Sequence, residues 1–511
     1  MSWIWAYGDR LSAAPGESVA FFMSATSPRC SVEIARVGRT RETVWRKDGI
    51  EVGRHGTPDR PHENGCDWPE AFRLKIPADW RSGYYELRFE GEDGAVGRHM
   101  LCVKPATPTA RAVLVLATNT YHAYNSWGGA NSYAWVGGPE PALVPPDPAD
   151  HTIARRLSTR RPFSPGILQP SSPTHRIVNP HRRGFRERAS TGEVSDEVKA
   201  GGQGWDCPAG FVDKWEHAFV AWAEAAGYAL DYVIDADLET ETLDGYRVAL
   251  FVGHSEYWSW HQRAEVERFV DAGGRIAILS GNTCYWQCRP EGTEIAFYKQ
   301  FAENEDPVAG TPAYRHLTSG LWASPWVGKP EAQLTGLSFL YGGYHRFGMC
   351  VSRGVGGYTV AREDHWALAG TDLYWGDVFG DECRLVGYEN DGCLFTIGED
   401  GLPRALERGG VPAGLEIIAT APCTLFEPVQ SEFSGRVPPE PIATLTRAVA
   451  GYDGPEIRTR LRRGHAVMAS FQRGQGEVFN AGTTEWAYGL AAGNPFVDRI
   501  TRNVLDRFLA E

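Results

Sequence analysis

The sequence predicts an α/β plus β protein, in which a doubly wound parallel sheet is combined with regions built mainly from strands. The chain has 511 residues, which is enough for two or three domains. Short strand patterns without helices fill the first hundred or so residues, and strands alternate with helices after a Pro-containing stretch at 104–109. Such alternation is typical of a parallel sheet that carries helices on both faces.

Residues 1–106 are expected to form an N-terminal β-sandwich. Short apolar or alternating runs separated by turn signals such as Pro15-Gly16 and Asp93-Gly94 are typical of antiparallel strands. The clearest of these runs are 19–23, 31–37 and 84–89. The stretch at 104–109, with its two prolines, is expected to be a linker to the next domain.

Residues 107–310 are expected to form the first part of the α/β domain. The continuous apolar run 112–117 fits a strand that is buried on both faces. Residues 136–210, rich in Pro, Arg, Ser and Gly, indicate an irregular excursion. The other expected elements are a helix at 214–226, strands at 229–234, 247–252 and 275–279, and a helix at 259–272 that ends before Gly273-Gly274.

Residues 311–475 are expected to be a β-rich insertion, because helical patterns become rare there and pairs of glycines separate short apolar runs. Residues 476–511 are expected to return to the α/β domain. They contain one more strand pattern at 476–482 and an amphipathic closing helix at 494–509.

Composition excludes several classes of protein. The net charge of −13 argues against a general nucleic-acid binder. The longest apolar runs are too short to cross a bilayer. No signal peptide, with basic residues followed by an apolar run, is visible, so we expect a cytoplasmic protein. The ten cysteines are scattered, and Cys284 and Cys288 have no matching pair nearby. Reduced, buried thiols are therefore expected, and neither a zinc ribbon nor a disulfide framework.

The strongest chemical signal is the segment Gly253-His254-Ser255-Glu256-Tyr257, which directly follows a buried strand. In open α/β sheets, ligands bind beyond the carboxyl ends of the strands. His254 and Glu256 are two residues apart, so in an extended segment they point to the same side. Glu256 could instead only stabilise the N-terminus of the next helix, but that role does not need a neighbouring histidine.

A nucleophile is a second interpretation of the same segment. Ser255 could occupy a strand-to-helix elbow, but that motif needs glycine two residues after the serine, where this chain has Tyr257. Cys207 and Cys284 are weaker candidates, because neither has a histidine partner that the sequence identifies.

Candidate residues also occur in three other parts of the chain, two of which directly follow a strand. Asn282, after the strand at 275–279, could donate to a developing oxyanion or simply be a turn residue. The loop after the strand at 112–117 contains Tyr121, Tyr124 and Tyr133. Such tyrosines either pack half-buried, or form the wall of a binding site or a set of ligands there. Glu389 is an isolated acid and, taken alone, would be a surface residue.

Several motifs, in their order along the chain, together resemble the large (catalytic) subunit of N,N-dimethylformamidase. The resemblance covers about residues 110–511. The motifs are the Tyr-Asn-x-Trp-Gly-Gly loop at 124–133, Arg161-Pro162-Phe163, the segment 253–259, Ala272-Gly273-Gly274, the segment 281–286, Gly387-Tyr388-Glu389 and Phe479-Asn480-Ala481-Gly482.

This resemblance implies a glutamine-amidotransferase-like α/β domain joined to β-sandwich domains, and a hydrolase of carbon–nitrogen bonds in small amides. It also implies a mononuclear iron, Fe(III), held by two tyrosines and one glutamate. By motif, Glu256 would be the metal carboxylate and Tyr133 one tyrosinate ligand, while the other tyrosine, Tyr121 or Tyr124, stays open. His254 would be the neighbour of Glu256 in the active site. Asn282 would be the polar contact to substrate, and Glu389 the general base.

Ferric iron is a hard Lewis acid that suits phenolate and carboxylate oxygens, and it would polarise an amide carbonyl. The resemblance thus implies a small-molecule amide as the partner. The net charge and the short apolar runs described above argue against nucleic acid and a membrane. We expect a homo-oligomer and leave a small partner subunit open. The alternative function is a non-catalytic or carbohydrate-related binding protein with a degenerate amidotransferase-like domain, which metal analysis would distinguish from the enzyme.

Overall fold

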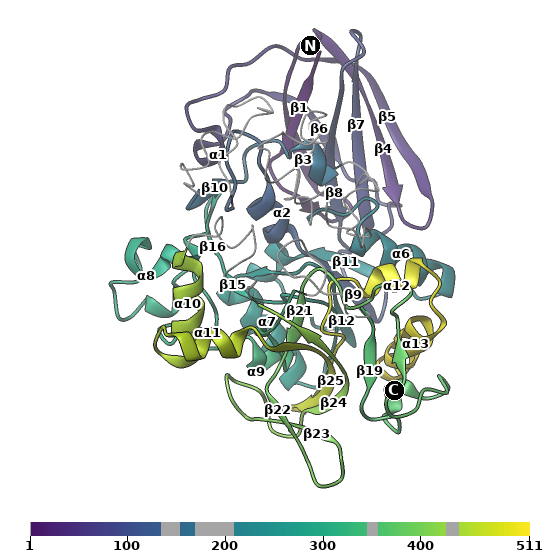
Figure 1. Ribbon diagram of the computed structural model, residues 1–511. Helices are drawn as coiled ribbons and strands as arrows, with labels where there is room; N and C mark the ends of the chain where they lie inside the picture. The colour runs from purple at the N-terminus through teal and green to yellow at the C-terminus, as the bar shows by residue number, and fades with distance from the viewer. Residues whose placement is uncertain (1, 134–153, 169–208, 345–355, 426–438, 511) are drawn as a thin grey trace. The chain divides into compact units, whose positions relative to one another are not determined.

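The computed structural model describes residues 2–133, 154–168, 209–344, 356–425 and 439–510 (Figure 1). It divides into two compact units. Unit 1 is formed from residues 1–175, 194–241 and 289–297, and unit 2 from residues 176–193, 242–288 and 298–511. Cys207 and most of the expected excursion at 136–210 lie outside the described residues.

The first hundred residues of unit 1 form two antiparallel-rich sheets around one core. Three strands make the first sheet, in the order β1 (Ile4–Gly8), β3 (Ser18–Ala25) and β6 (Glu70–Lys75). The second sheet has the order β2 (Ser12–Ala13), β8 (Val96–Val103), β7 (Gly83–Gly91), β4 (Arg29–Val37) and β5 (Arg41–Glu51). Phe21 and Phe72 from one sheet and Leu87 and Phe89 from the other share a buried cluster. The strands expected at 19–23, 31–37 and 84–89 are confirmed as β3, β4 and β7.

The rest of unit 1 contains a parallel strand pair and its helices. The apolar run after the linker is β9 (Ala112–Leu116), which pairs in parallel with β11 (Leu230–Ile234). Its other elements are α1 (Pro61–Asn64), α2 (Thr118–Tyr124), α3 (Pro165–Leu168), α6 (Trp215–Ala226), the 3-10 helix η2 (Asp235–Glu239) and a sheet of β10 (Arg156–Ser158), β17 (Glu294–Ala296) and β16 (Arg289–Glu291).

The sheet of unit 2 changes from parallel to antiparallel along its width. β12 (Val248–Gly253), β14 (Arg275–Ser280) and β26 (Gly476–Asn480) are parallel neighbours. β25 (Gly464–Arg473) and β24 (Glu416–Cys423) then continue the sheet in antiparallel pairing. Beyond them lie β19 (Tyr358–Val360) and β20 (Val378–Phe379), and β23 (Pro403–Ala405) pairs with both β24 and β22 (Phe395–Ile397).

Helix α7 (Trp260–Asp271) lies shortly after the segment 253–257, and capping residues mark both of its ends. The Ser259 hydroxyl accepts a hydrogen bond from the Gln262 backbone N–H at 3.0 Å, and the Gln262 side chain closes the capping box. Gly273, with φ +107°, lies just after the helix, where the left-handed region favours glycine. The helices expected at 214–226, 259–272 and 494–509 and the strands at 229–234, 247–252, 275–279 and 476–482 are each confirmed to within two residues.

The remaining elements of unit 2 are short. Two of its sheets have two strands each, β13 (Tyr257–Trp258) with β15 (Trp286–Gln287), and β18 (Ser338–Gly343) with β21 (Asn390–Gly392). Its helices are η3 (Lys299–Phe301), α8 (Ala302–Glu305), η4 (Arg315–Leu317), α9 (Ala332–Thr335), η5 (Trp366–Leu368), α10 (Pro439–Ala450), α11 (Pro455–Leu461), α12 (Trp486–Ala491) and α13 (Pro495–Leu509). Across the described ranges, every helix is too short or too polar to pass through a bilayer.

Candidate active site

The candidate site begins where β12 ends. All six residues of β12 are buried, and its last residue, Gly253, has φ +76°, a left-handed conformation that favours glycine. The chain then leaves the sheet through His254, Ser255 and Glu256 before it enters β13. This turn places ionisable side chains at the carboxyl edge of a parallel sheet, where open α/β sheets bind ligands.

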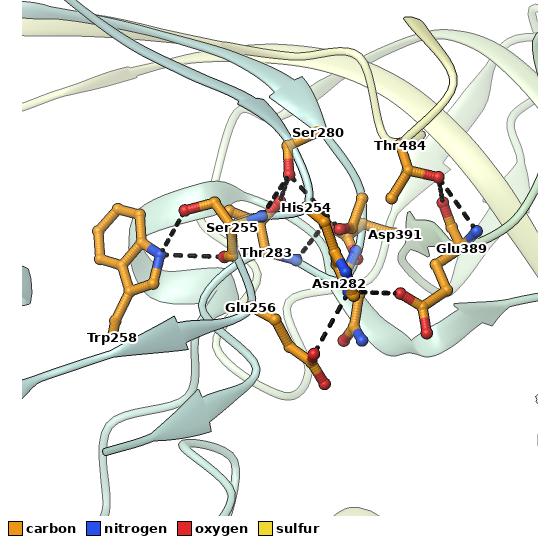
Figure 2. A network of polar contacts seen from close by, with 11 residues as sticks. His254, Ser255, Glu256, Trp258, Ser280, Asn282, Thr283, Glu389, Asp391 and Thr484 are labelled. Carbon is orange, nitrogen blue, oxygen red and sulfur yellow. Dashed lines mark hydrogen bonds and ion pairs between the residues drawn. The ribbon is translucent and has the colours of Figure 1, made fainter. Parts of the chain in front are cut away.

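One imidazole lies between two carboxylates (Figure 2). The Nε2 atom of His254 is 2.7 Å from Oε2 of Glu389 and 3.3 Å from Oε2 of Glu256. None of the three residues is more than 4% exposed. A histidine carries at most one positive charge, so His254 by itself cannot neutralise both carboxylates when both are ionised.

Glu389 reaches this group from the chain just before β21. Its backbone is fixed by Thr484, whose N–H donates to the Glu389 carbonyl at 3.1 Å and whose Oγ1 accepts from the Glu389 N–H at 3.3 Å. The expectation from the residues alone, that Glu389 lies on the surface, is wrong, because its side chain is buried. It is the contact with His254 that explains a carboxylate in this interior.

Asn282 follows β14, the parallel neighbour of β12, and its loop contacts the segment after β12, because the Cys284 N–H donates to the Ser255 carbonyl at 2.9 Å. The φ of Asn282 is +54°, an uncommon value that asparagine tolerates better than most residues. Its side chain is 2% exposed, and among the described residues its Oδ1 atom has no hydrogen-bond partner. A buried amide oxygen without a partner is rare in proteins, so Asn282 is suited to meet a polar group that the chain itself does not supply.

A buried carboxylate that the sequence reasoning missed holds the Asn282 turn. Asp391 Oδ1 accepts from the Asn282 backbone N–H at 2.7 Å, and its Oδ2 accepts from the Thr283 N–H at 3.2 Å. Burial raises the pKa of Asp391 from 3.8 to about 7, against the lowering effect of these two N–H groups. The only sequence signal was its place two residues after Glu389.

The alternative nucleophiles have other roles here. Ser255 Oγ accepts a hydrogen bond from the indole Nε1 of Trp258 at 3.0 Å. Among the contacts of the described residues, no base takes the Ser255 proton. Cys284 is fully buried, and that burial raises the pKa of its thiol, which keeps it protonated and a weak nucleophile.

The expected tyrosines lie in unit 1 and are described there by themselves. The Tyr121 hydroxyl donates a hydrogen bond to Glu216, and burial together with that carboxylate raises the pKa of Tyr121 well above its ordinary value. The rings of Tyr124 and Tyr133 lie 4.4 Å apart between centroids, at an interplanar angle of 31°. Within unit 1 the structure therefore brings Tyr124 and Tyr133 together, while Tyr121 is bound to Glu216.

Carboxylate and phenolate oxygens are the hard donors that ferric iron prefers. Within the described parts of the chain, no group of three or more His, Cys, Asp and Glu side chains is arranged to hold a metal ion. The predicted set is of another kind, one carboxylate with phenolates. Glu256 fits it, because its oxygen is a hard donor and its buried surroundings contain a second carboxylate whose charge a cation would offset.

Sequence comparisons give the chain its relatives. Residues 31–499 match the family described as N,N-dimethylformamidase beta subunit-like, C-terminal. The N,N-dimethylformamidase beta subunit of Paracoccus aminophilus is 24% identical over 509 residues, which cover 92% of this chain and 59% of that protein. The protein of the same name from an Alcaligenes species is 26% identical over 265 residues, 48% of this chain and 32% of the relative. The matched part is thus less than two thirds of either relative.

Proposed function

The chain belongs to the N,N-dimethylformamidase beta subunit-like, C-terminal family, and we propose that it hydrolyses a small amide at the site formed by His254, Glu256 and Glu389. The observation that carries the proposal is the buried carboxylate–imidazole–carboxylate contact at the end of β12. Because the two relatives are named for N,N-dimethylformamide, a small tertiary amide is the first substrate class to test. We also propose that the α/β elements have an amidotransferase-like arrangement and that this chain acts as the catalytic subunit.

Glu389 is the proposed general base. A water molecule that attacks the amide carbonyl carbon must lose a proton, and a carboxylate next to an imidazole can take it. The proton then passes to the amine nitrogen as the C–N bond breaks, which leaves a carboxylic acid and an amine. His254 lies 2.7 Å from Glu389, so a protonated imidazole there would balance the charge of that carboxylate.

Asn282 is the proposed contact to the substrate. The negative charge that develops on the carbonyl oxygen is best stabilised by donors that are already in position, and the Asn282 amide is held by a backbone turn fixed on Asp391. Its place after β14, the parallel neighbour of the strand that leads into His254 and Glu256, supports this role.

The proposed metal is iron, with Glu256 as its carboxylate ligand. When bound, ferric iron supplies a Lewis acid that polarises the amide carbonyl. The phenolate ligands, proposed from the resemblance alone, are Tyr133 with Tyr124 or Tyr121. Of the last two, Tyr124 is the better candidate, because the Tyr121 hydroxyl is bonded to Glu216.

The relatives are named as subunits, and we extend this to an assembly of more than one chain, either a homo-oligomer or a complex with a small subunit. The mass of the purified protein in solution tests this, since a monomer would contradict it.

The catalytic proposal is tested with iron-loaded protein and N,N-dimethylformamide, by measuring release of dimethylamine. Glu389→Gln should keep its metal and lose activity by a factor of about 10²–10⁴, the usual share of a general base. Glu256→Ala should lose metal and activity together, and visible absorption from phenolate-bound ferric iron should disappear with it. Glu303→Gln, an exposed change on α8, is the matched control.

Two results would overturn the proposal. One is an iron-loaded protein that releases no amine from N,N-dimethylformamide or from a panel of small amides. The other is a metal-free protein that hydrolyses the amide and loses that activity in Ser255→Ala, which would establish the serine nucleophile instead.

A further inference from the structure

A pocket with tryptophan walls lies in unit 1, lined by none of the residues assigned to amide hydrolysis. Its walls include Trp3, Trp5, Trp68 and Trp127, and its volume is about 140 Å³. A cavity of about 150 Å³ holds one benzene molecule, so the pocket has the size of a single six-membered ring.

Trp127 contacts two of the other tryptophans in the pocket wall. Its ring meets Trp5 and Trp68 edge to face, with centroids 6.0 Å and 5.8 Å apart. Trp68 and Trp127 are buried, while Trp3 and Trp5 are half-buried, so the aromatic walls run from the interior to the surface. These walls offer flat apolar area to a ring-shaped ligand.

One of the residues that line the pocket has a polar atom without a partner. The indole Nε1 of Trp68 donates to the Gly56 carbonyl at 2.9 Å. By contrast, the Nε1 atom of Trp127 is buried, and the described residues supply no acceptor for it. A buried donor without a partner is destabilising, and a ligand that brings an acceptor would satisfy it.

The rim of the pocket adds a positive charge. The Arg54 guanidinium lies 5.9 Å from the centre of the Trp3 ring, and no ion pair of Arg54 is found within the described part of the chain. The loop that carries it is fixed, because the His55 N–H donates to Ser24 Oγ at 2.9 Å and that hydroxyl donates back to the His55 carbonyl at 3.1 Å. None of the pocket's lining residues is an acid.

From the tryptophan walls, the unpartnered Trp127 N–H and the Arg54 charge, we propose that this pocket binds a six-membered ring that carries a carboxylate. The ring packs between the indoles, and the carboxylate accepts hydrogen bonds from Trp127 and Arg54. A cationic ring or a quaternary ammonium group is disfavoured by the Arg54 charge. The ring comes from an aromatic acid or from a sugar acid, since both share this chemistry. This site goes beyond the proposed amide hydrolysis and does not depend on it.

The experiment titrates the full chain with benzoate and with glucuronate by calorimetry, and with the neutral analogues benzyl alcohol and methyl glucoside. At least one of the acids should bind, and more tightly than its neutral analogue. Whichever of benzoate and glucuronate binds more tightly identifies the source of the ring. Binding of neither acid at millimolar concentration, or tighter binding of tetramethylammonium, would overturn the proposal.

Two conservative variants locate the binding. Trp127→Phe keeps an aromatic wall but removes the N–H, and should weaken binding about tenfold, the value of one hydrogen bond. Arg54→Gln should abolish the preference for the acid over its neutral analogue. Trp375→Phe and Arg29→Gln, at exposed positions outside the pocket, should bind as the parent does. Should Trp127→Phe fail to fold, Arg54→Gln decides alone, and an unchanged preference in that variant contradicts the site.

Discussion

The imidazole Nε2 of His254 lies 2.7 Å from the carboxylate of Glu389, and it thereby joins the end of a parallel strand to a turn from a later region of the chain. The same nitrogen lies 3.3 Å from Glu256. His254 is thus the one basic side chain in contact with both buried carboxylates of the site as described. Its removal has consequences for folding as well as for chemistry.

His254→Ala should lower the free energy of unfolding by about 3–5 kcal/mol, because it removes the imidazole that contacts two buried carboxylates. Adding Glu389→Gln should restore part of that loss, since the charge of one of these carboxylates is then removed. Urea denaturation of the two single variants and the double variant measures the coupling. His261→Ala, at an exposed position, should change little. Strictly additive losses would show that the contact contributes no stability.

Gly281→Ala should be destabilising by about 1–3 kcal/mol, as expected for an overpacked core. A Cβ atom at Gly281 would lie 2.3 Å from the Glu389 carbonyl oxygen and 2.8 Å from the Thr484 nitrogen, and both are backbone atoms. Gly310→Ala is the control, because its Cβ would meet nothing within 4 Å. Thermal unfolding of the two variants should separate them by several degrees, and equal melting temperatures would argue against this close approach.

Asn282→Gly and Asn282→Ala should separate the role of the side chain from that of the backbone. With φ at +54°, alanine is strained by about 1 kcal/mol or more, whereas glycine adopts this conformation readily. Both variants should lose amide hydrolysis, but Asn282→Gly should be the more stable in urea. If the glycine variant keeps full activity, the side chain is not a substrate contact.

Asp235→Asn should make stability less dependent on pH. Burial is the main cause that raises the pKa of Asp235 from 3.8 to about 8. Between these values the folded chain keeps a proton that the unfolded chain releases, so the free energy of unfolding falls as pH rises, by about 1.4 kcal/mol per unit. Asparagine can satisfy the same neighbours, Thr118 Oγ1 and the Asn119 N–H. Glu216 is present in both proteins, so the difference between their free energies of unfolding from pH 5 to 8 reports on Asp235 alone. Parallel curves would contradict the assignment.

The elements that the sequence predicted well are those with a local signal. The strand 247–252 is marked by its apolar run and the helix 259–272 by Gly273-Gly274 at its end, and together they place His254 and Glu256 at a strand end without any long-range information. Glu389 is different. Its burial depends on Thr484 and His254, which are distant in the chain, so no local pattern could reveal it, and only the resemblance pointed there.

Asp391 shows the same limit more sharply. It acts through two backbone N–H groups on a distant loop, and a contact to backbone leaves no trace in the type of the partner residue. The tyrosines of the loop 118–133 illustrate another case, because Tyr121 and Tyr124 lie on one short helix and only their three-dimensional surroundings separate them.

Unit 1 is assembled from three separate stretches of the chain, and this has a consequence for biosynthesis. Its small sheet needs β17, at Glu294–Ala296, to pair with both β10 and β16. A ribosome that makes the protein from its N-terminus must therefore produce β12 and α7 of unit 2 before unit 1 can be completed. A nascent chain arrested shortly after residue 241 would contain the β-sandwich strands. It would lack β17, the central strand of the small sheet. The two units cannot mature strictly one after the other.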